Sequence, residues 1–250
     1  MDKKYKLGII GGGNMARAIV LGALKSGLLT SKEIIVSDKV NEQLICFQGL
    51  GIDTITDNKA VASSCEYLLF AIKPQQSQAV FSEIKDCSFE NAVSIMAGVT
   101  ISKIRDSLGN KNIARVMTNT PALVGMGMSA IAFSDGFKSD FLLSLFSSFG
   151  KTVVLEEKYF DAVTAVSGSG PAYVYMFIKS MVDAGAALGL DRETAKYLTV
   201  QTFAGAAKMV EDSPFDIETL INNVCSKGGT TIQAVESFRD DGLEEIIKKG

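Results

Sequence analysis

The sequence predicts an α/β fold for its first part and an all-α fold for its second. Up to about residue 157, short apolar runs alternate with amphipathic helical segments, which is typical of a mostly parallel sheet covered on both faces. From residue 158 onward the strand signal vanishes and only helical periodicity remains. No repeat, low-complexity tract or flexible linker interrupts the 250 residues. We therefore expect two domains, 1–157 and 158–250, joined at a rigid junction.

The elements of the first domain follow from the same patterns. Compact apolar runs predict strands at 6–10, 33–38, 67–72, 92–96, 113–117, 129–134 and 152–155. Apolar residues at helical spacing predict helices at 14–25, 41–50, 75–84, 102–108 and 140–149. Gly27 is typical of a helix C-terminus, and Pro74 cannot continue a strand ladder, so each marks the end of an element.

The second domain is expected to contain helices at 171–190, 191–210, 216–224 and 230–239. Pro171 suits a first helical turn, and Asp191 suits an N-cap. The helix at 171–190 is apolar nearly all round, and such a helix must be buried within something large. A helical domain of roughly ninety residues is small for that. We therefore expect burial against a partner subunit, in a homo-oligomer.

Composition excludes several classes of protein. With 25 basic and 28 acidic side chains, the net charge of −3 lacks the basic footprint of a nucleic-acid partner. No apolar run of about 18 residues predicts a membrane span, and the start MDKKYKLGII is not a signal peptide, so we expect a cytoplasmic protein. Histidine is absent, which removes imidazole bases and histidine-ligated metals. The four cysteines form no CxxC pair, so we expect buried, reduced thiols and no metal.

A glycine-rich motif follows the first expected strand directly and opens the first helix. It has the form G-x-G-x-x-A and comprises Gly11, Gly12, Gly13, Asn14, Met15 and Ala16. Gly11 permits a tight turn, Gly13 lets the backbone approach a pyrophosphate, and Ala16 allows close packing of helix on strand. The helix N-terminus attracts the diphosphate. The motif predicts a Rossmann-type dinucleotide site, and a purely structural turn is the alternative.

Asp38 ends the second expected strand. A carboxylate there accepts hydrogen bonds from an adenosine ribose diol and repels a 2′-phosphate, which favours NAD. The adjacent Lys39 would tolerate the phosphate. The expected cofactor is therefore NADPH or NADH.

Five further segments make the interpretation specific. They are FAIKPQ (70–75), MAGVT (96–100), RVMTNTPA (115–122), SGSGPAY (167–173) and VCSKGGTT (224–231). In this order and spacing, the chain resembles the pyrroline-5-carboxylate reductase family over essentially its whole length. The resemblance implies NAD(P)H-dependent reduction of L-1-pyrroline-5-carboxylate to L-proline, the last step of proline biosynthesis. It also implies a Rossmann domain joined to a helical dimerisation domain, with dimers commonly assembled into rings.

The resemblance also implies roles for individual residues near the substrate. Thr231 would hydrogen-bond the ring nitrogen, Glu157 would contact it, and the amides of Gly229 and Thr230 would hold the carboxylate. The remaining expected substrate residues are Ser226, Gly228, Ser169 and Gly170. The turn at 226–231 precedes a helix, so its amides would favour an anion. The alternatives are an ordinary Ser/Thr helix cap for this turn and a solvated carboxylate for Glu157.

The implied cofactor residues beyond the glycine motif and Asp38 follow other strands and loops. Asn58 would reach the adenosine ribose, Asn119 would orient the carboxamide, and backbone would line the cofactor at Ala71, Ile72, Lys73, Pro74, Ala97 and Gly98. The alternatives are a helix cap at Asn58 and an Asx turn before Pro121 at Asn119.

Two departures from the family and two competing functions stand beside this interpretation. Lys227 stands where the family usually has proline, and the family usually continues as a helix past the position of Gly250. One competing function is an NAD(P)-dependent imine reductase or a 3-hydroxyacid dehydrogenase-like enzyme. The other is a non-catalytic nucleotide-binding regulatory protein, which would need no site for a substrate carboxylate.

Overall fold

The computed structural model describes residues 3–250 and divides the chain into two compact units, Met1–Tyr173 and Val174–Gly250. The first unit continues past Glu157, through α7 (Phe160–Val163) and into the first turn of α8 (Gly170–Ala187). The boundary between the two compact units thus lies after Tyr173. The expected division into functional domains after residue 157 stays a prediction.

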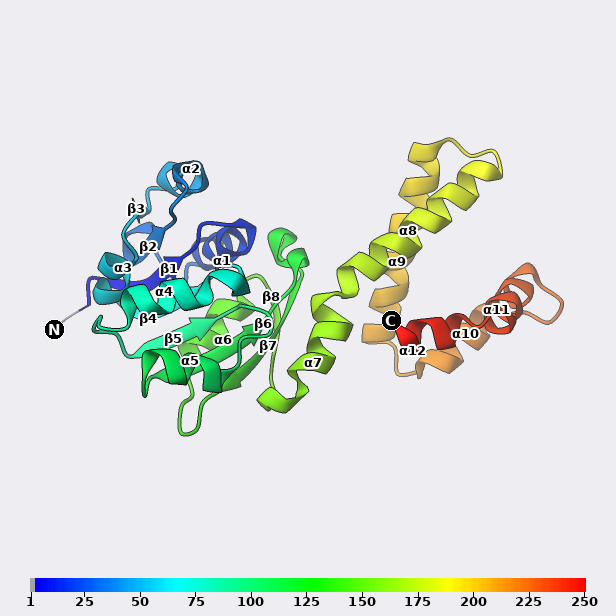
Figure 1. The fold of residues 1–250 in the computed structure, drawn as a ribbon. Helices are drawn as coiled ribbons and strands as arrows, with labels where there is room; N and C mark the ends of the chain where they lie inside the picture. The colour runs from blue at the N-terminus through cyan, green and yellow to red at the C-terminus, as the bar shows by residue number, and fades with distance from the viewer. Residues whose placement is uncertain (1–2) are drawn as a thin grey trace. The chain divides into compact units, whose positions relative to one another are not determined.

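The first unit is built on one eight-stranded sheet (Figure 1). Its strand order is β3-β2-β1-β4-β5-β6-β7-β8, and neighbouring strands are parallel except for β6 and β7. The bounds are β1 Tyr5–Ile10, β2 Ile34–Ser37, β3 Asp53–Ile55, β4 Cys65–Phe70, β5 Asn91–Ser94, β6 Asn112–Met117, β7 Gly127–Phe133 and β8 Gly150–Val154. The mostly parallel sheet is confirmed. The order reverses between β1 and β4, where open α/β sheets form their ligand crevice.

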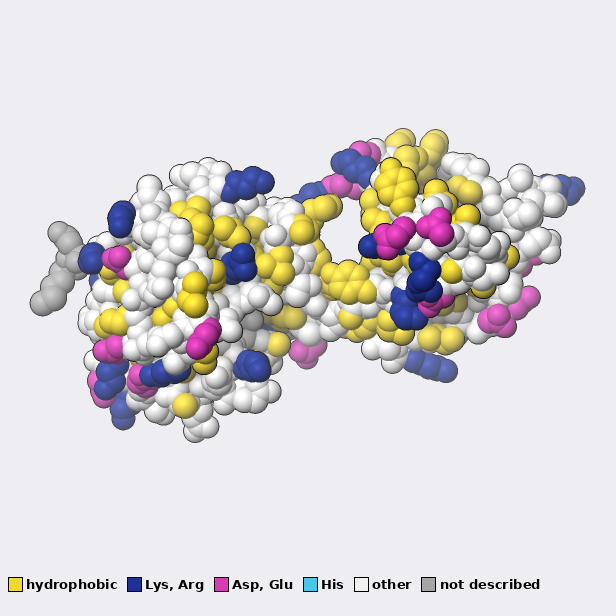
Figure 2. Space-filling view, turned by 90° about the horizontal axis from the view of Figure 1, so that it is seen from above, with side chains coloured by type: hydrophobic (Ala, Val, Ile, Leu, Met, Phe, Trp, Pro, Cys, Tyr) yellow, Lys and Arg dark blue, Asp and Glu magenta, His cyan; other side chains and the backbone are white. Residues whose placement is uncertain are grey.

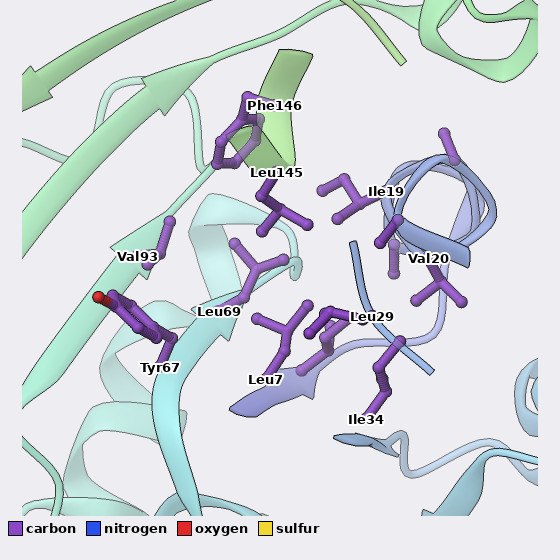
Figure 3. Close-up of a cluster of buried hydrophobic side chains, with 14 of the residues drawn as sticks. Leu7, Ile19, Val20, Leu29, Ile34, Tyr67, Leu69, Val93, Leu145 and Phe146 are labelled. Atoms are coloured by element: carbon purple, nitrogen blue, oxygen red, sulfur yellow. The ribbon is translucent and has the colours of Figure 1, made fainter. Parts of the chain in front are cut away.

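Helices cover both faces of this sheet. Their bounds are α1 Asn14–Lys25, α2 Asn41–Gly49, α3 Asn58–Ser64, α4 Ser77–Ile84, α5 Ile101–Leu108 and α6 Asp140–Ser147. Leu7 and Ile9 of β1 pack in one core cluster with α1, α2 and α6, while the neighbouring Ile10 packs in a second cluster with α3, α4 and α5. Figure 3 shows side chains of the first cluster. Alternate residues of one strand are thus buried on opposite faces, as a doubly covered sheet requires.

Three details differ from the expected elements. Strand β3 and helix α3 were not predicted, because β3 has only three half-buried residues and α3 only seven in all. Strand β4 ends at Phe70, two residues earlier than expected, and Ala71 follows it at the glycine turn. The Ala71 amide still donates to the Ile10 carbonyl at 2.8 Å, and the Ala71 carbonyl lies against Gly11.

The second unit is entirely helical, as predicted. It contains the rest of α8, then α9 (Arg192–Asp212), α10 (Ile217–Val224), α11 (Thr230–Asp240) and α12 (Leu243–Lys249), of which α12 was not predicted. Asp191 caps α9 by accepting a hydrogen bond from the Thr194 amide at 3.0 Å. Asp216 caps α10 in the same way, and its hydrogen bonds with Thr219 hold the pKa of its carboxyl below the usual value. Capping chemistry therefore sets where these helices begin.

Large apolar side chains cover much of the surface of the helical unit (Figure 2). More than half of the residue surface is exposed at Tyr175, Met176, Leu188, Tyr197, Leu198, Met209, Phe215, Ile217, Val224, Phe238, Ile246 and Ile247. Exposed apolar surface of this extent marks an interaction site. No helix within residues 3–250 is long and apolar enough to cross a membrane.

The packing of α1 on the segment after α6 gives a test of the fold. A Cβ on Gly22 would lie 2.8 Å from both Phe149 Cβ and Ser148 Oγ. Ala is the better helix former by about 1 kcal/mol, but overpacking costs about 1–3 kcal/mol. We predict that Gly22→Ala lowers the free energy of unfolding by about 1–2 kcal/mol, measured by urea denaturation at fixed protein concentration.

Gly49 at the end of α2 is the matched control, because a Cβ there meets nothing within 4 Å. Gly49→Ala should be neutral or stabilising by a few tenths of a kcal/mol. A stabilised Gly22→Ala protein would contradict the packing described here.

Candidate functional site

The glycine turn after β1 ties the carboxyl ends of three strands together. The Gly11 amide donates to the Ser37 carbonyl of β2 at 2.7 Å, and the Ala71 amide after β4 donates to the Ile10 carbonyl at 2.8 Å. Gly11 has φ of 102°, and a Cβ on it would lie 2.5 Å from the Ala71 oxygen. Glycine is therefore required at this position by conformation and by space.

Helix α1 begins at Gly13 with backbone that is open to a ligand. Gly13 is its N-cap, in extended conformation, and no side chain caps the helix. A Cβ on Gly13 would meet nothing within 4 Å, whereas Gly12 is buried and Ala16 is fully buried against the core. Asn14 is exposed and Met15 is half-buried. An uncapped helix N-terminus with free space in front of it fits the diphosphate of a dinucleotide.

Asp38 follows β2 and folds back onto the glycine turn. Its Oδ2 accepts a hydrogen bond from the Gly12 amide at 2.8 Å, and its Oδ1 accepts one from the Val40 amide at 2.9 Å. Each carboxylate oxygen can accept a second hydrogen bond, so both retain capacity for a ribose hydroxyl. The carboxylate is thus held in place beside the expected diphosphate site.

Asn58, the first residue of α3, is only 2% exposed. Its Oδ1 accepts a hydrogen bond from Ser37 Oγ at 2.8 Å, and its Nδ2 donates to Glu83 Oε2 at 2.9 Å. The alternative role as helix cap is wrong, because Asp57 caps α3 by accepting from the amides of Lys59 and Ala60.

The other expected cofactor residues lie at the same edge of the sheet. The pairings Ile10↔Phe70 and Phe70↔Ser94 align the carboxyl ends of β1, β4 and β5. The segment from Ala71 through Ile72 and Lys73 to Pro74 follows β4, and Ala97 and Gly98 follow β5. Gly98 has φ of 71°, and a Cβ there meets nothing within 4 Å. The structure therefore brings these residues together with the glycine turn.

Asn119 has a structural contact on each end of its amide. Its Oδ1 accepts a hydrogen bond from the Met128 amide at 2.9 Å, and its Nδ2 donates to the Ser167 carbonyl at 3.1 Å. The alternative of an Asx turn is wrong for this residue, because its side-chain oxygen is bonded to Met128 of β7. Asn119 thus links the loop after β6 to the π-helical turn Thr164–Gly168.

Glu157 is held in an ion pair with a buried arginine. Its Oε1 lies 3.0 Å from Arg115 Nη1 and accepts a hydrogen bond from the Ile101 amide at 2.8 Å. Arg115 is 6% exposed, and its guanidinium carbon lies 4.7 Å from the centre of the Phe160 ring. The alternative of a solvated carboxylate is therefore wrong. Sequence reasoning missed Arg115, although a cation within the apolar run of β6 is a signal for a buried pair.

These residues border an open pocket of about 330 Å³. It is lined by Gly98, Thr100, Arg115, Glu157, Lys158 and Asp161. Ser169 and Gly170 lie further along the first unit, at the start of α8, and both are half-buried. Gly98 thus faces the pocket that Glu157 also lines.

The turn at 226–231 belongs to the second unit and resembles the glycine turn in its chemistry. Gly229 is the N-cap of α11 in extended conformation, again without a capping side chain, and Gly228 has φ of 71°. The Gly229 amide donates to the Ser226 carbonyl at 2.9 Å. Thr230 opens the helix and Thr231 is half-buried within its first turn. An ordinary Ser/Thr cap is therefore not what begins this helix.

Cysteines and metal ligands add no further chemistry to the site. All four cysteines are free, but only Cys65 is buried, so the expectation of four buried thiols is wrong. Burial raises the pKa of the Cys65 thiol to about 12. Among the described residues, no group of three or more Cys, Asp or Glu side chains is placed to hold a metal ion.

Comparison with known proteins decides the family. The family described as "Pyrroline-5-carboxylate reductase dimerisation" matches residues 157–250, and that described as "NADP oxidoreductase coenzyme F420-dependent" matches residues 6–98. The pyrroline-5-carboxylate reductase of Pasteurella multocida is 39% identical, over 96% of this chain and 91% of the relative. The chain belongs to the pyrroline-5-carboxylate reductase family.

Further members of this family are similar to the chain over nearly its whole length, in sequence and in structure. The reductase of Pisum sativum is 35% identical over 99% of this chain and 92% of its own length. The solved reductase of Coxiella burnetii has a TM-score of 0.89 at 33% identity, covering 99% of this chain and 94% of that one. The Plasmodium falciparum reductase, solved with NADP bound, has a TM-score of 0.87 at 30% identity, covering 99% and 95%.

Membership of the family decides between the competing functions. A reductive aminase from Aspergillus terreus and an imine reductase from Streptomyces aurantiacus are only 14% and 15% identical, so they share the fold alone. The chain is an NAD(P)H-dependent oxidoreductase, and its helical part is a dimerisation domain. The exposed apolar side chains of the helical unit lie within residues 157–250, the part that matches the dimerisation family.

The Arg115–Glu157 pair gives a prediction for this family member. Glu157→Ala leaves a buried guanidinium without its carboxylate and removes the acceptor of the Ile101 amide. We predict a loss of about 1–3 kcal/mol in the free energy of unfolding, measured by urea denaturation.

The neighbouring Glu156 is the matched control, because it pairs with Lys158 and both side chains are at least 60% exposed. Glu156→Ala should change the same free energy by less than about 0.5 kcal/mol. If both variants lost the same free energy of unfolding, the buried Arg115–Glu157 pair would contribute no more to stability than an exposed pair.

Proposed function

We propose that the chain reduces the C=N bond of L-1-pyrroline-5-carboxylate with NADPH or NADH, giving L-proline. The observation that carries this proposal is the match to pyrroline-5-carboxylate reductases over 96–99% of the chain at 35–39% identity. The glycine turn supports the cofactor, and the turn at 226–231 supports an anionic substrate. Reduction of this imine is the last step of proline biosynthesis, which we place in the cytoplasm.

The substrate chemistry explains why a chain without histidine suffices. The substrate is a five-membered ring with a C=N bond and a carboxylate, and its protonated imine is already electrophilic. When bound, the reduced nicotinamide supplies the hydride. The protein then needs to position the reacting atoms within about 3–3.5 Å of one another, and a strong general acid is not required.

The amides of two uncapped helices would hold the two anionic ligands. The amides at the start of α1, from Gly13 onward, would bind the diphosphate, and Asp38 would accept hydrogen bonds from the adenosine ribose. Gly11 and Gly12 would shape this site, because their own amides donate to Ser37 and Asp38. At the start of α11 the Thr230 amide would bind the substrate carboxylate, and Gly229, whose amide donates to the Ser226 carbonyl, would line the site.

Two side chains are proposed to contact the ring nitrogen. The hydroxyl oxygen of Thr231 would accept a hydrogen bond from the N–H of the protonated imine. Glu157 already uses Oε1 for Arg115 and the Ile101 amide, so we assign this contact to its Oε2. Both groups would orient the imine and stabilise its positive charge.

We further propose that the chain works as a homodimer or as a ring of dimers. The exposed apolar side chains of α8 and α9 support this arrangement, because a single chain leaves them in contact with water. Removing this surface from solvent is the main driving force available for association.

A spectrophotometric assay tests the proposed reaction. NADPH or NADH absorbance should decay when pyrroline-5-carboxylate is added, and it should not decay with a keto acid of similar size. Decay with the keto acid alone would contradict the proposal.

We predict that Thr231→Ala lowers kcat by about 10- to 1,000-fold, because it removes a hydrogen bond to the reacting nitrogen. The dissociation constant of NADPH, measured by fluorescence, should change less than about twofold. Thr231→Ser keeps the hydroxyl and should retain most of the activity. Full activity in Thr231→Ala would remove Thr231 from the mechanism.

Asp38 gives a prediction about the cofactor. Because its carboxylate is fixed beside the turn and would repel a 2′-phosphate, kcat/KM with NADH should be at least comparable to that with NADPH. Asp38→Asn keeps the size, removes the charge, and should lower the NADH:NADPH ratio about tenfold. Strong preference of the parent for NADPH would refute this argument.

A further inference from the structure

Four side chains form a continuous polar chain beside the end of β2. Ser37 Oγ donates to Asn58 Oδ1 at 2.8 Å, Asn58 Nδ2 donates to Glu83 Oε2 at 2.9 Å, and Lys39 Nζ lies 3.0 Å from Glu83 Oε1. We call these residues the Glu83 network. Ser37 and Asn58 are buried, the Glu83 side chain is 28% exposed, and the Lys39 side chain is 63% exposed. The network therefore runs from the sheet to the surface.

The network borders the place where a dinucleotide presents its adenosine ribose. Ser37 is the last residue of β2, and its carbonyl accepts the Gly11 amide of the glycine turn. Asp38 lies between Ser37 and Lys39 and is bonded to the Gly12 amide. The residue at this position in a Rossmann fold contacts the ribose 2′-hydroxyl, so a 2′-phosphate would lie beside Asp38 and Lys39.

The charged side chains beside the 2′ position of the ribose would repel a phosphate. Asp38 and Glu83 carry two negative charges and Lys39 carries one positive charge, so the group is net negative before a phosphate of nearly two negative charges arrives. Both oxygens of the Glu83 carboxylate are hydrogen-bonded: Oε1 accepts from Lys39 and Oε2 accepts from the Asn58 amide. A phosphate would have to compete with this carboxylate for both donors.

We propose that Glu83 is a specificity-determining residue, which disfavours NADPH relative to NADH by holding Lys39 and Asn58 and by adding a negative charge beside the 2′ position. The proposal rests on the proposed function only in that the chain binds a nicotinamide dinucleotide. Glu83 lies on α4, 45 residues after Asp38 in number, and its role is separate from that of Asp38.

The test measures binding of each cofactor without substrate. Dissociation constants of NADPH and NADH are determined by fluorescence titration for the parent and for Glu83→Gln, at one fixed salt concentration. Glu83→Gln removes the charge and frees Lys39, so NADPH should bind about 5- to 20-fold more tightly while NADH changes less than about twofold. Glu83→Asp keeps the charge and should retain the parent's ratio.

Glu66→Gln is the matched control. Glu66 pairs with Lys6 at 2.8 Å, near the beginnings of β4 and β1, at the opposite edge of the sheet from the glycine turn. Its loss removes the same charge from the protein but should leave the NADPH:NADH ratio unchanged. An equal change of the ratio in Glu66→Gln would overturn the proposal, because overall charge would then explain the effect.

A double variant tests the part played by Lys39. In a Lys39→Met background, the gain in NADPH binding from Glu83→Gln should be smaller than in the parent, because only the effect of removing the Glu83 charge and its hold on Asn58 remains. Equal changes for both cofactors in Glu83→Gln would assign Glu83 a merely structural role and overturn the proposal. A shifted binding ratio in a protein that does not reduce pyrroline-5-carboxylate would support the role of Glu83 and contradict only the proposed reaction.

Discussion

The close contact between Gly11 and the Ala71 carbonyl is the constraint on which the rest of the site depends. A Cβ at Gly11 would lie 2.5 Å from that oxygen, so the carboxyl ends of β1 and β4 approach each other only because the residue is glycine. The Gly11 amide then reaches the Ser37 carbonyl of β2. This turn sets the position of α1, of Asp38 and of the segment after β4 together, at the point where the strand order reverses and where open α/β sheets bind their ligands.

Helices α1 and α11 begin in the same way. Helices α1 and α11 both begin at an extended glycine without a capping side chain, whereas α3, α5, α6, α9 and α10 begin at capping Asp, Thr or Ser residues. A capped N-terminus spends its amide donors within the chain, and an uncapped one leaves them for a ligand. The reaction proposed here needs two such anion sites, one for a diphosphate and one for a carboxylate.

The sequence predicted the parts of this structure that depend on local pattern. Continuous apolar runs located most of the strands, and Asp191, expected as an N-cap, located a helix start, because strand burial and capping act over a few residues. The glycine motif likewise located the turn after β1 and the start of α1. The Arg115–Glu157 and Lys39–Glu83 pairs were not predicted, because residues 42 and 44 positions apart meet only once the sheet has formed. Likewise the alternative that Asn58 caps a helix is wrong, because its neighbour Asp57 caps α3, which only the structure shows.

The most direct test of the account is a crystal structure with NADP⁺ and L-proline bound together. We expect the diphosphate on the amides of Gly13–Ala16 and the proline carboxylate on the Thr230 amide beside Gly229, with Thr231 hydrogen-bonded to the ring nitrogen. A carboxylate bound elsewhere, or a diphosphate away from the start of α1, would contradict it.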